Sequence, residues 1–212
     1  KLTLIKSMTI GTAGFTAAQC IDSLQRHDIT PERGPIVVTG ATGGVGSLAV
    51  MLLAKLGYEV QAVTGKRDRH DWLRERGASQ LPDRAEVDDS SNRPLLKGRF
   101  AGAVDTVGGN TLATILRSLT HRGCATACGL VGGAELPLTV YPFILRGVTL
   151  DGIDSANCPR APRERIWQLL AGDWNLAELD ALRQVISPEE LEDEINRILA
   201  GEVTGRVVVD FR

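Results

Sequence analysis

Short apolar runs alternate with longer amphipathic segments along most of this 212-residue chain. The apolar runs are rich in valine, alanine and isoleucine, and they predict strands at residues 35–39, 58–63, 101–107, 124–129 and 148–153, with a weaker one at 79–81. Helical periodicity predicts helices at residues 11–27, 45–56, 67–76, 110–119, 162–171 and 188–200. Strands without a polar face are typical of a parallel sheet that is covered on both sides. We therefore predict an α/β fold, a doubly wound parallel sheet with helices on both faces.

The last apolar run, residues 205–211, predicts a further strand at the end of the chain. The pattern leaves two places for this strand. It can add to the predicted sheet, or it can belong to a second domain that is missing from this sequence.

A glycine-rich turn directly follows the first predicted strand. Gly40, Gly43, Gly44 and Gly46 come after Thr39 and lead into the next predicted helix. Such a turn lets the backbone approach a diphosphate, and the helix N-terminus presents free N–H groups and the positive end of its dipole. The alternative is a tight turn without a ligand. Because the glycines lie between a buried strand and an apolar helix, we predict a dinucleotide site of the Rossmann type.

The same turn differs from a P-loop. A Walker A motif requires Lys and then Ser or Thr directly after its last glycine. Here Ser47 and Leu48 follow Gly46, so phosphoryl transfer is disfavoured.

The end of the second predicted strand indicates which dinucleotide binds. NAD-binding sites of this kind carry Asp or Glu about 20 residues after the glycines, where the carboxylate binds the ribose hydroxyl. Here residues 62–67 contain no carboxylate, and Thr64, Lys66 and Arg67 supply a hydroxyl and two positive charges. This cluster attracts a 2′-phosphate, which a carboxylate would repel. We therefore predict NADPH as the cofactor; the alternative is that Lys66 and Arg67 only begin a solvated helix.

Composition narrows the range of partners. The net charge of −2 disfavours nucleic acid and anionic membrane surfaces as partners. No apolar run approaches the roughly 20 residues that span a bilayer. Residues 1–10 lack the long apolar stretch of a signal peptide, so we expect a cytoplasmic protein.

The cysteines give no clear sign of a metal site. Cys20, Cys124, Cys128 and Cys158 form no CxxC pair, and a site built on Cys124 and Cys128 would need two further ligands. Small buried side chains along one strand are the favoured interpretation. We predict no metal.

Several segments together resemble a known family of oxidoreductases. MTIGTAGFTA (residues 8–17) and VTGATGGVG (38–46) resemble the zinc-independent medium-chain dehydrogenase/reductases. Shorter segments narrow the resemblance to the acrylyl-CoA reductase branch, often named quinone oxidoreductases; they are VTGK (63–66), DTVGG (105–109), CGL (128–130), PFILRGV (142–148) and GIDS (152–155). The resemblance runs over nearly the whole chain.

The resemblance implies two groups of cofactor-binding residues near the glycine turn. The residues that would contact the diphosphate are Thr42, Gly43, Gly44 and Val45. Those that would surround the 2′-phosphate are Thr64, Gly65 and Lys66.

Four further residues follow from the resemblance, with core packing or turn formation as the alternative for each. Arg84 falls where the family has another cofactor-binding arginine, although residues 81–83 depart from the family's pattern. Leu130 would lie where the nicotinamide ribose passes. Ile144 and Ser155 would lie near the nicotinamide end.

The resemblance also implies a domain that this sequence lacks. Members of the family carry an N-terminal, barrel-like substrate domain that closes over the nicotinamide. We therefore expect residues 1–204 to form an NADPH-binding Rossmann domain with a leading connector helix. We expect residues 205–212 to be a C-terminal strand that returns toward the missing catalytic domain.

The implied reaction is the NADPH-dependent reduction of the C=C bond of an α,β-unsaturated carbonyl compound. Acrylyl-CoA is the first candidate substrate, and a quinone, an enone or another acyl-CoA is the alternative partner. The resemblance also implies pairing into a homodimer. No Tyr-x-x-x-Lys or Ser-His-Asp arrangement is visible, so the catalytic residues stay unknown. A non-enzymatic NADPH-binding sensor is the rival hypothesis from a different class.

Overall fold

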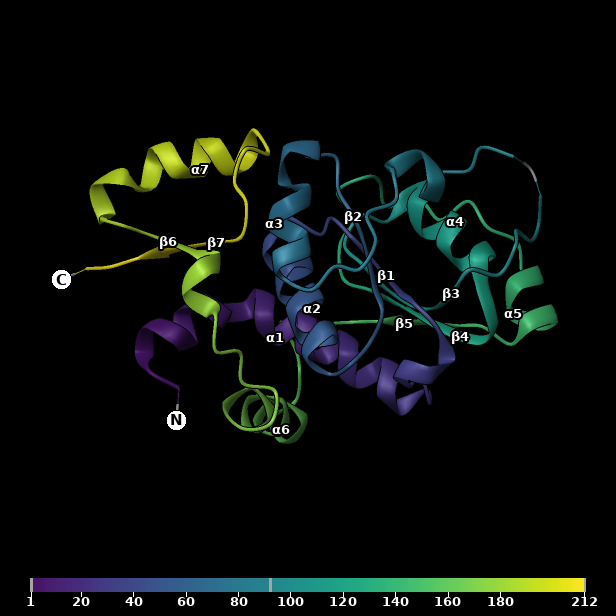
Figure 1. Ribbon diagram of the computed structural model, residues 1–212, viewed down its shortest axis with the longest axis horizontal. Coiled ribbons are helices and arrows are strands. Elements are labelled where there is room, and N and C mark those ends of the chain that lie inside the picture. Colours follow the sequence, from purple (N-terminus) through teal and green to yellow (C-terminus); the bar gives the residue numbers. More distant parts are fainter. Residues whose placement is uncertain (1, 92, 212) are drawn as a thin grey trace.

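The computed structural model describes residues 2–91 and 93–211, and its central feature is a five-stranded parallel sheet (Figure 1). The strand order is β2-β1-β3-β4-β5, and every neighbouring pair is parallel. The strands are β1 (Ile36–Thr39), β2 (Val60–Val63), β3 (Phe100–Asp105), β4 (Leu119–Ala127) and β5 (Thr149–Gly152). Because the chain moves from β1 outward to β2 and then crosses back to β3, the carboxyl end of β1 is the point where the strand order reverses.

Helices cover both faces of this sheet. They are α1 (Leu4–Arg26), α2 (Gly44–Lys55), α3 (His70–Glu75), α4 (Gly109–Ser118), α5 (Tyr141–Arg146) and α6 (Arg160–Ala171). Short 3₁₀ turns lie at η1 (Pro31–Arg33), η2 (Arg67–Arg69), η3 (Arg84–Val87) and η4 (Leu179–Leu182). The predicted doubly wound α/β fold is confirmed.

The two faces of β1 belong to two hydrophobic cores. Ile36 and Val38 join the core that contains α1, α2 and α6. Val37 joins the core on the other face, together with Ile115 of α4. Since both faces are covered, all four residues of the strand are buried, which explains why the sequence shows no polar alternation there.

Helix α1 differs from its predicted range. It begins at Leu4, seven residues before the predicted start at Gly11, with Thr3 as its N-cap. Gly11 itself interrupts the helix, with φ 50° and ψ −157°. The sequence pattern placed the start of the helix at the position where the structure has a break.

A second, smaller sheet lies apart from the first, at the left of Figure 1. Strand β6 (Arg183–Ile186) pairs in parallel with β7 (Arg206–Val209), and η5 (Pro188–Glu190) with α7 (Leu191–Leu199) connects them. The predicted terminal strand therefore exists, but it adds to this sheet and leaves the main sheet unchanged. The pattern did not predict β6 or α5. Residues 1, 92 and 212 of the predicted domain ranges lie outside the described residues.

Candidate cofactor-binding site

The turn between β1 and α2 leaves the N-terminus of α2 without a side-chain cap. Gly43 is the N-cap residue, and it supplies no side-chain hydrogen bond. The first helical hydrogen bond runs from the Ser47 amide to the Gly43 carbonyl at 2.9 Å. Within the described residues, the amides of Gly44 and Val45 therefore have no protein acceptor and are free to bind an anion.

Gly46 allows the close packing on which this turn depends. A Cβ at this position would lie 2.4 Å from the Gly40 carbonyl oxygen and 2.8 Å from the Ala41 Cα. No side chain fits there, so the third glycine of the motif holds α2 against the end of β1.

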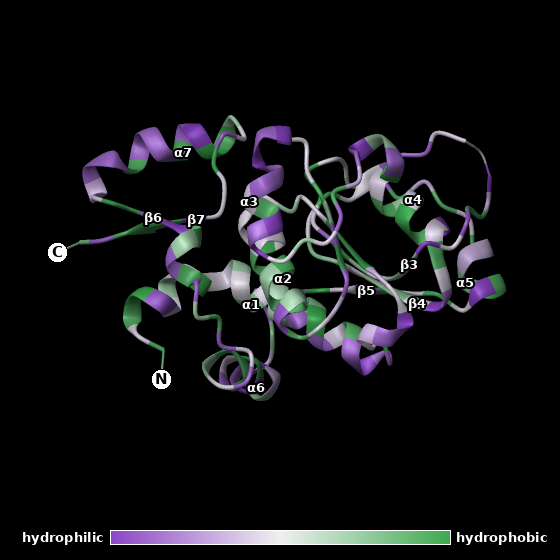
Figure 2. Ribbon diagram, in the orientation of Figure 1, coloured by the Kyte–Doolittle hydropathy of each residue, from purple (hydrophilic) through white to green (hydrophobic). Residues whose placement is uncertain are grey.

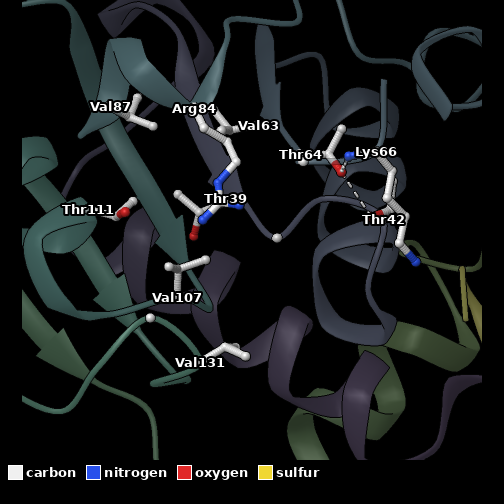
Figure 3. A pocket seen from close by; sticks show the side chains of 13 residues that line it. Thr39, Thr42, Val63, Thr64, Lys66, Arg84, Val87, Val107, Thr111 and Val131 are labelled. Carbon is white, nitrogen blue, oxygen red and sulfur yellow. Dashed lines mark hydrogen bonds between the residues drawn. The ribbon is translucent and has the colours of Figure 1, made fainter. Parts of the chain in front are cut away.

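An open pocket of about 290 Å³ lies beside this turn, at the carboxyl ends of β1, β2 and β3 (Figure 3). Ligands of doubly wound sheets bind at this edge, where the strand order reverses. The lining residues are Thr39, Gly40, Thr42, Val63, Thr64, Gly65, Lys66, Arg84, Val87, Val107, Thr111, Val131 and Gly132.

A hydrogen bond between two threonines joins the glycine turn to the turn after β2. The hydroxyls of Thr42 and Thr64 lie 3.0 Å apart, and both residues are buried. The Thr64 hydroxyl also accepts from the Lys66 amide at 3.1 Å. The two predicted contact regions, for the diphosphate and for the 2′-phosphate, therefore form one connected wall.

A buried carboxylate braces the floor of the pocket. Asp105 accepts from the Thr39 hydroxyl and from the Gly108 amide, each at 2.7 Å. Burial raises the pKa of Asp105 above its ordinary value, and these hydrogen bonds oppose that shift. The group fixes the ends of β1 and β3 relative to each other.

Lys66, which was predicted for the 2′-phosphate, and Arg84, which was predicted as a further cofactor-binding arginine, point in different directions. Lys66 Nζ donates to the Val203 carbonyl at 2.7 Å and lies 3.5 Å from the Thr204 hydroxyl. Figure 3 shows its ammonium directed away from Arg84, whose side chain extends across the pocket. Arg84 Nη1 lies 3.3 Å from the place a Cβ on Gly65 would take. Among the described residues, Arg84 has no hydrogen-bond or ion-pair partner, so its guanidinium is available to an anion.

Partial burial also affects Lys66. Desolvation is the main cause that lowers the pKa of its ammonium, and the neighbouring Arg69 lowers it further. The nearby Arg67 instead forms an exposed ion pair with Asp83 at 2.9 Å, which fits the alternative of a solvated helix start for that residue.

Arg206, at the start of β7, reaches the glycine turn from the far end of the chain. Its Nε donates to the Thr9 carbonyl at 3.0 Å, and its Nη1 lies 2.8 Å from the place a Cβ on Gly44 would take. Burial lowers the pKa of the Arg206 guanidinium. The sequence analysis missed this residue, and the available signal was a lone cation inside the apolar run after Gly205.

The predicted nicotinamide-side residues lie outside the lining of this pocket. Leu130 and Ile144 are 67% and 69% exposed, and Val131, next to Leu130, is part of the lining. The Ser155 carbonyl accepts from Arg163 at 2.9 Å, which is a turn contact. The structure thus brings Thr42, Gly65, Lys66 and Arg84 together, and it leaves Leu130, Ile144 and Ser155 apart from them.

Metal and membrane features are also absent from the described part of the chain. Within residues 2–91 and 93–211, no group of three or more His, Cys, Asp or Glu side chains could hold a metal ion. Burial raises the pKa of Cys124 to about 12, which keeps it a neutral thiol. No helix in these ranges is long and apolar enough to cross a membrane.

A comparison with known protein families identifies the family of this chain. The profile of the family described as zinc-binding dehydrogenase matches residues 44–172, from the first residue of α2 to the end of α6. The chain belongs to this family. The match includes the turn after β2, Arg84 and all of the main sheet except β1.

Individual proteins are similar over almost all of the chain. Acrylyl-CoA reductase AcuI of Ruegeria pomeroyi is 47% identical over 205 residues, which cover 97% of this chain and 62% of that protein. The YhdH oxidoreductase of Salmonella enterica, solved in complex with NADP, is 43% identical with a TM-score of 0.96, covering 100% of this chain and 64% of that one. Bacillus subtilis YhfP, solved with NAD bound, is 44% identical with a TM-score of 0.96, covering 99% of this chain and 64% of that one.

These relatives confirm the resemblance found in the sequence, to the acrylyl-CoA reductase branch of the dehydrogenases. They also show how much of each relative this chain covers. The chain spans less than two thirds of the length of each of these relatives.

Proposed function

We propose that this chain is the NADPH-binding domain of an oxidoreductase that reduces the C=C bond of an α,β-unsaturated carbonyl compound, with acrylyl-CoA as substrate. The observation that carries the proposal is the N-terminus of α2, which has no side-chain cap, beside a pocket into which the guanidinium of Arg84 extends without a partner among the described residues. A dinucleotide with an extra phosphate satisfies both groups, because free amides and a guanidinium are both anion-binding groups.

The bound cofactor would lie along the connected wall of the pocket. The diphosphate would contact Thr42, Gly43, Gly44 and Val45, where free amides and the nearby Arg206 guanidinium meet. The 2′-phosphate would lie between the turn at Thr64, Gly65 and Lys66 and the guanidinium of Arg84. The nicotinamide half would extend toward Leu130, Ile144 and Ser155.

The chemistry divides between the cofactor and the chain. NADPH supplies a hydride when it is bound. The residues of this chain bind and orient the cofactor, and the brace from Asp105 to Thr39 keeps the strand ends fixed beneath it. We assign no proton donor to this chain, and we place that group in a substrate domain.

An exposed apolar surface on α7 supports the proposal of a partner domain. Leu191, Ile195, Ile198 and Leu199 share one side of α7 at helical spacing, and all four are exposed. We propose that a substrate domain of the kind implied by the resemblance packs on this surface. Its closure over the nicotinamide would complete the active site.

The cofactor assignment is tested by titrating NADPH and NADH into the wild-type chain and into Arg84→Met, with fluorescence as the readout. Loss of one charged hydrogen bond costs about 1.5–3 kcal/mol, so NADPH affinity should fall about 10- to 100-fold while NADH affinity changes little. Arg67→Met is the matched control, because it removes the same charge from a residue already paired with Asp83. Equal loss for both cofactors would contradict the assignment of Arg84 to the 2′-phosphate.

The substrate is tested in a protein that joins this chain to a substrate domain. NADPH consumption is followed with acrylyl-CoA and, separately, with a soluble quinone. We expect turnover with acrylyl-CoA. Turnover with the quinone alone would assign the quinone reductase activity instead, and NADPH binding without turnover of either would favour a sensor.

A further inference from the structure

The break in α1 separates a short N-terminal piece from the rest of the helix. At φ 50° and ψ −157°, Gly11 adopts a backbone conformation that is close to the region reserved for glycine. The longer piece beyond the break packs into the core through residues such as Phe15 and Ile21. The piece before it, residues 4–10, exposes Leu4 and Met8.

Arg206 holds the piece before the break. A helix break leaves carbonyl groups without their helical donors. The Thr9 carbonyl, two residues before Gly11, accepts from Arg206 Nε at 3.0 Å. Arg206 Nη2 lies 2.9 Å from the place a Cβ on Gly11 would take, so the guanidinium packs directly against the break.

The same guanidinium faces the N-terminus of α2. Its Nη1 lies beside Gly44, whose amide is one of the free donors of the glycine turn. Among the described residues, neither Nη1 nor Nη2 has a hydrogen-bond partner. One planar group therefore links the break in α1 to the proposed diphosphate site, with donors still free on the diphosphate side.

The piece before the break also forms one wall of an apolar groove. The groove has a volume of about 450 Å³, and its lining includes Leu4 and Met8 on one side and Val208 and Phe211 on the other. Both walls are connected to Arg206. One is held through the Thr9 carbonyl, and the other continues from Arg206 along β7.

We propose that Arg206 couples the cofactor's diphosphate to the break at Gly11, so that cofactor binding stiffens the N-terminal piece of α1 and fixes the shape of the groove. The inference rests on the proposed function. A diphosphate bound to Nη1 restrains the guanidinium while Nε keeps its bond to the Thr9 carbonyl. Arg206 is then a positioning residue for residues 4–10, in addition to its contact with the cofactor.

Hydrogen exchange of residues 4–10 tests the coupling, measured without cofactor and at saturating NADPH. In the wild-type chain, NADPH should slow exchange of these amides about fivefold or more, the usual lower range for coupled sites. Arg206→Met, also measured at saturation, should bind NADPH and lose the slowing. Arg84→Met is the matched control: it weakens NADPH but leaves the Arg206 contacts intact, so the slowing should persist once the site is filled.

The outcomes separate this inference from the proposed function. If the wild-type chain binds NADPH without slower exchange at residues 4–10, or if Arg206→Met keeps the slowing, the coupling is wrong and the proposed function stands. If the chain binds no NADPH, both are wrong. Should Arg206→Met fail to fold, Arg206→Lys gives the same test, because it keeps the charge and lacks the fork that reaches both Thr9 and Gly44.

Discussion

Two regions of the molecule differ in how they treat their apolar residues: the main five-stranded sheet with its helices (the body), and β6, α7 and β7 (the C-terminal unit). Both contain apolar residues at regular spacing, but the helix of the C-terminal unit leaves them exposed. In the body, apolar residues of the strands and of α2 are buried between two layers of helices. In the C-terminal unit, the apolar residues of α7 are exposed, Leu199 at 80% and Ile198 at 52%, while Glu194 is the residue that α7 buries. Figure 2 shows hydrophobic residues on the strands of both sheets. The body covers its own apolar surface, whereas the C-terminal unit leaves one exposed, and we propose that a substrate domain packs on it.

The largest expected effect is on the free energy of unfolding, and it is measured by one substitution in each of the two regions. Leu52 of α2 is fully buried, so Leu52→Ala should lower the free energy of unfolding by about 2–5 kcal/mol. Ile198→Ala on α7 should change it by about 0.5 kcal/mol or less, because its side chain is half exposed. Urea denaturation of both variants measures the difference. Comparable losses at the two positions would show that α7 is packed against the body in solution.

A smaller effect is expected where the body's close packing reaches the cofactor turn. Gly46→Ala places a Cβ where only 2.4 Å separates it from the Gly40 oxygen, so overpacking should cost about 1–3 kcal/mol of stability. Because the shift displaces the free amides of α2, NADPH and NADH should weaken together. Gly98→Ala is the control for glycine loss away from the site, since Gly98 is exposed and a Cβ there would meet Thr120 Cγ2 only at the ordinary contact distance of 3.4 Å. If Gly46→Ala bound NADPH and NADH as tightly as the wild-type chain, the glycine turn would not be part of the cofactor site.

The smallest effect concerns the junction between the two regions. Lys66 ties the body to the segment before β7 through the Val203 carbonyl, and the Gly205 amide donates to the Thr42 carbonyl at 3.0 Å. Lys66→Met removes one short hydrogen bond, to Val203, and one long one, to Thr204, from a partly exposed group, so stability should fall by about 1 kcal/mol or less. Exchange of the Gly205 amide should become faster. Arg84→Met should leave the exchange rate of the Gly205 amide unchanged. If exchange became faster by the same factor in both variants, the effect would not come from the contact between Lys66 and Val203.

Much of the body could be predicted because local sequence determines it. Buried parallel strands read as continuous apolar runs, and the glycine turn has a backbone requirement that Gly46 makes visible in the sequence. The part of α1 before Gly11 was missed because the pattern placed the start of the helix at Gly11, where the structure has a break. Strand β6 was missed because its four residues, Arg183–Ile186, mix charged and apolar side chains.

The least predictable part of the site is the contribution from distant segments. Arg206 meets Thr9 across 197 positions of sequence, and Lys66 meets Val203 across 137. No local pattern encodes such contacts, because they depend on how β7 returns to the glycine turn. The resemblance named Lys66 for the 2′-phosphate, and the fold shows that its ammonium also has a structural partner.

The central claim is that the free amides at the start of α2 and the guanidinium of Arg84 together hold NADPH. A crystal structure of this chain grown with saturating NADPH tests it most directly. We predict the diphosphate against the amides of Gly44 and Val45, and the 2′-phosphate within hydrogen-bonding distance of Arg84. An empty pocket at saturating cofactor, or a nucleotide bound with Arg84 turned away from it, would contradict the account.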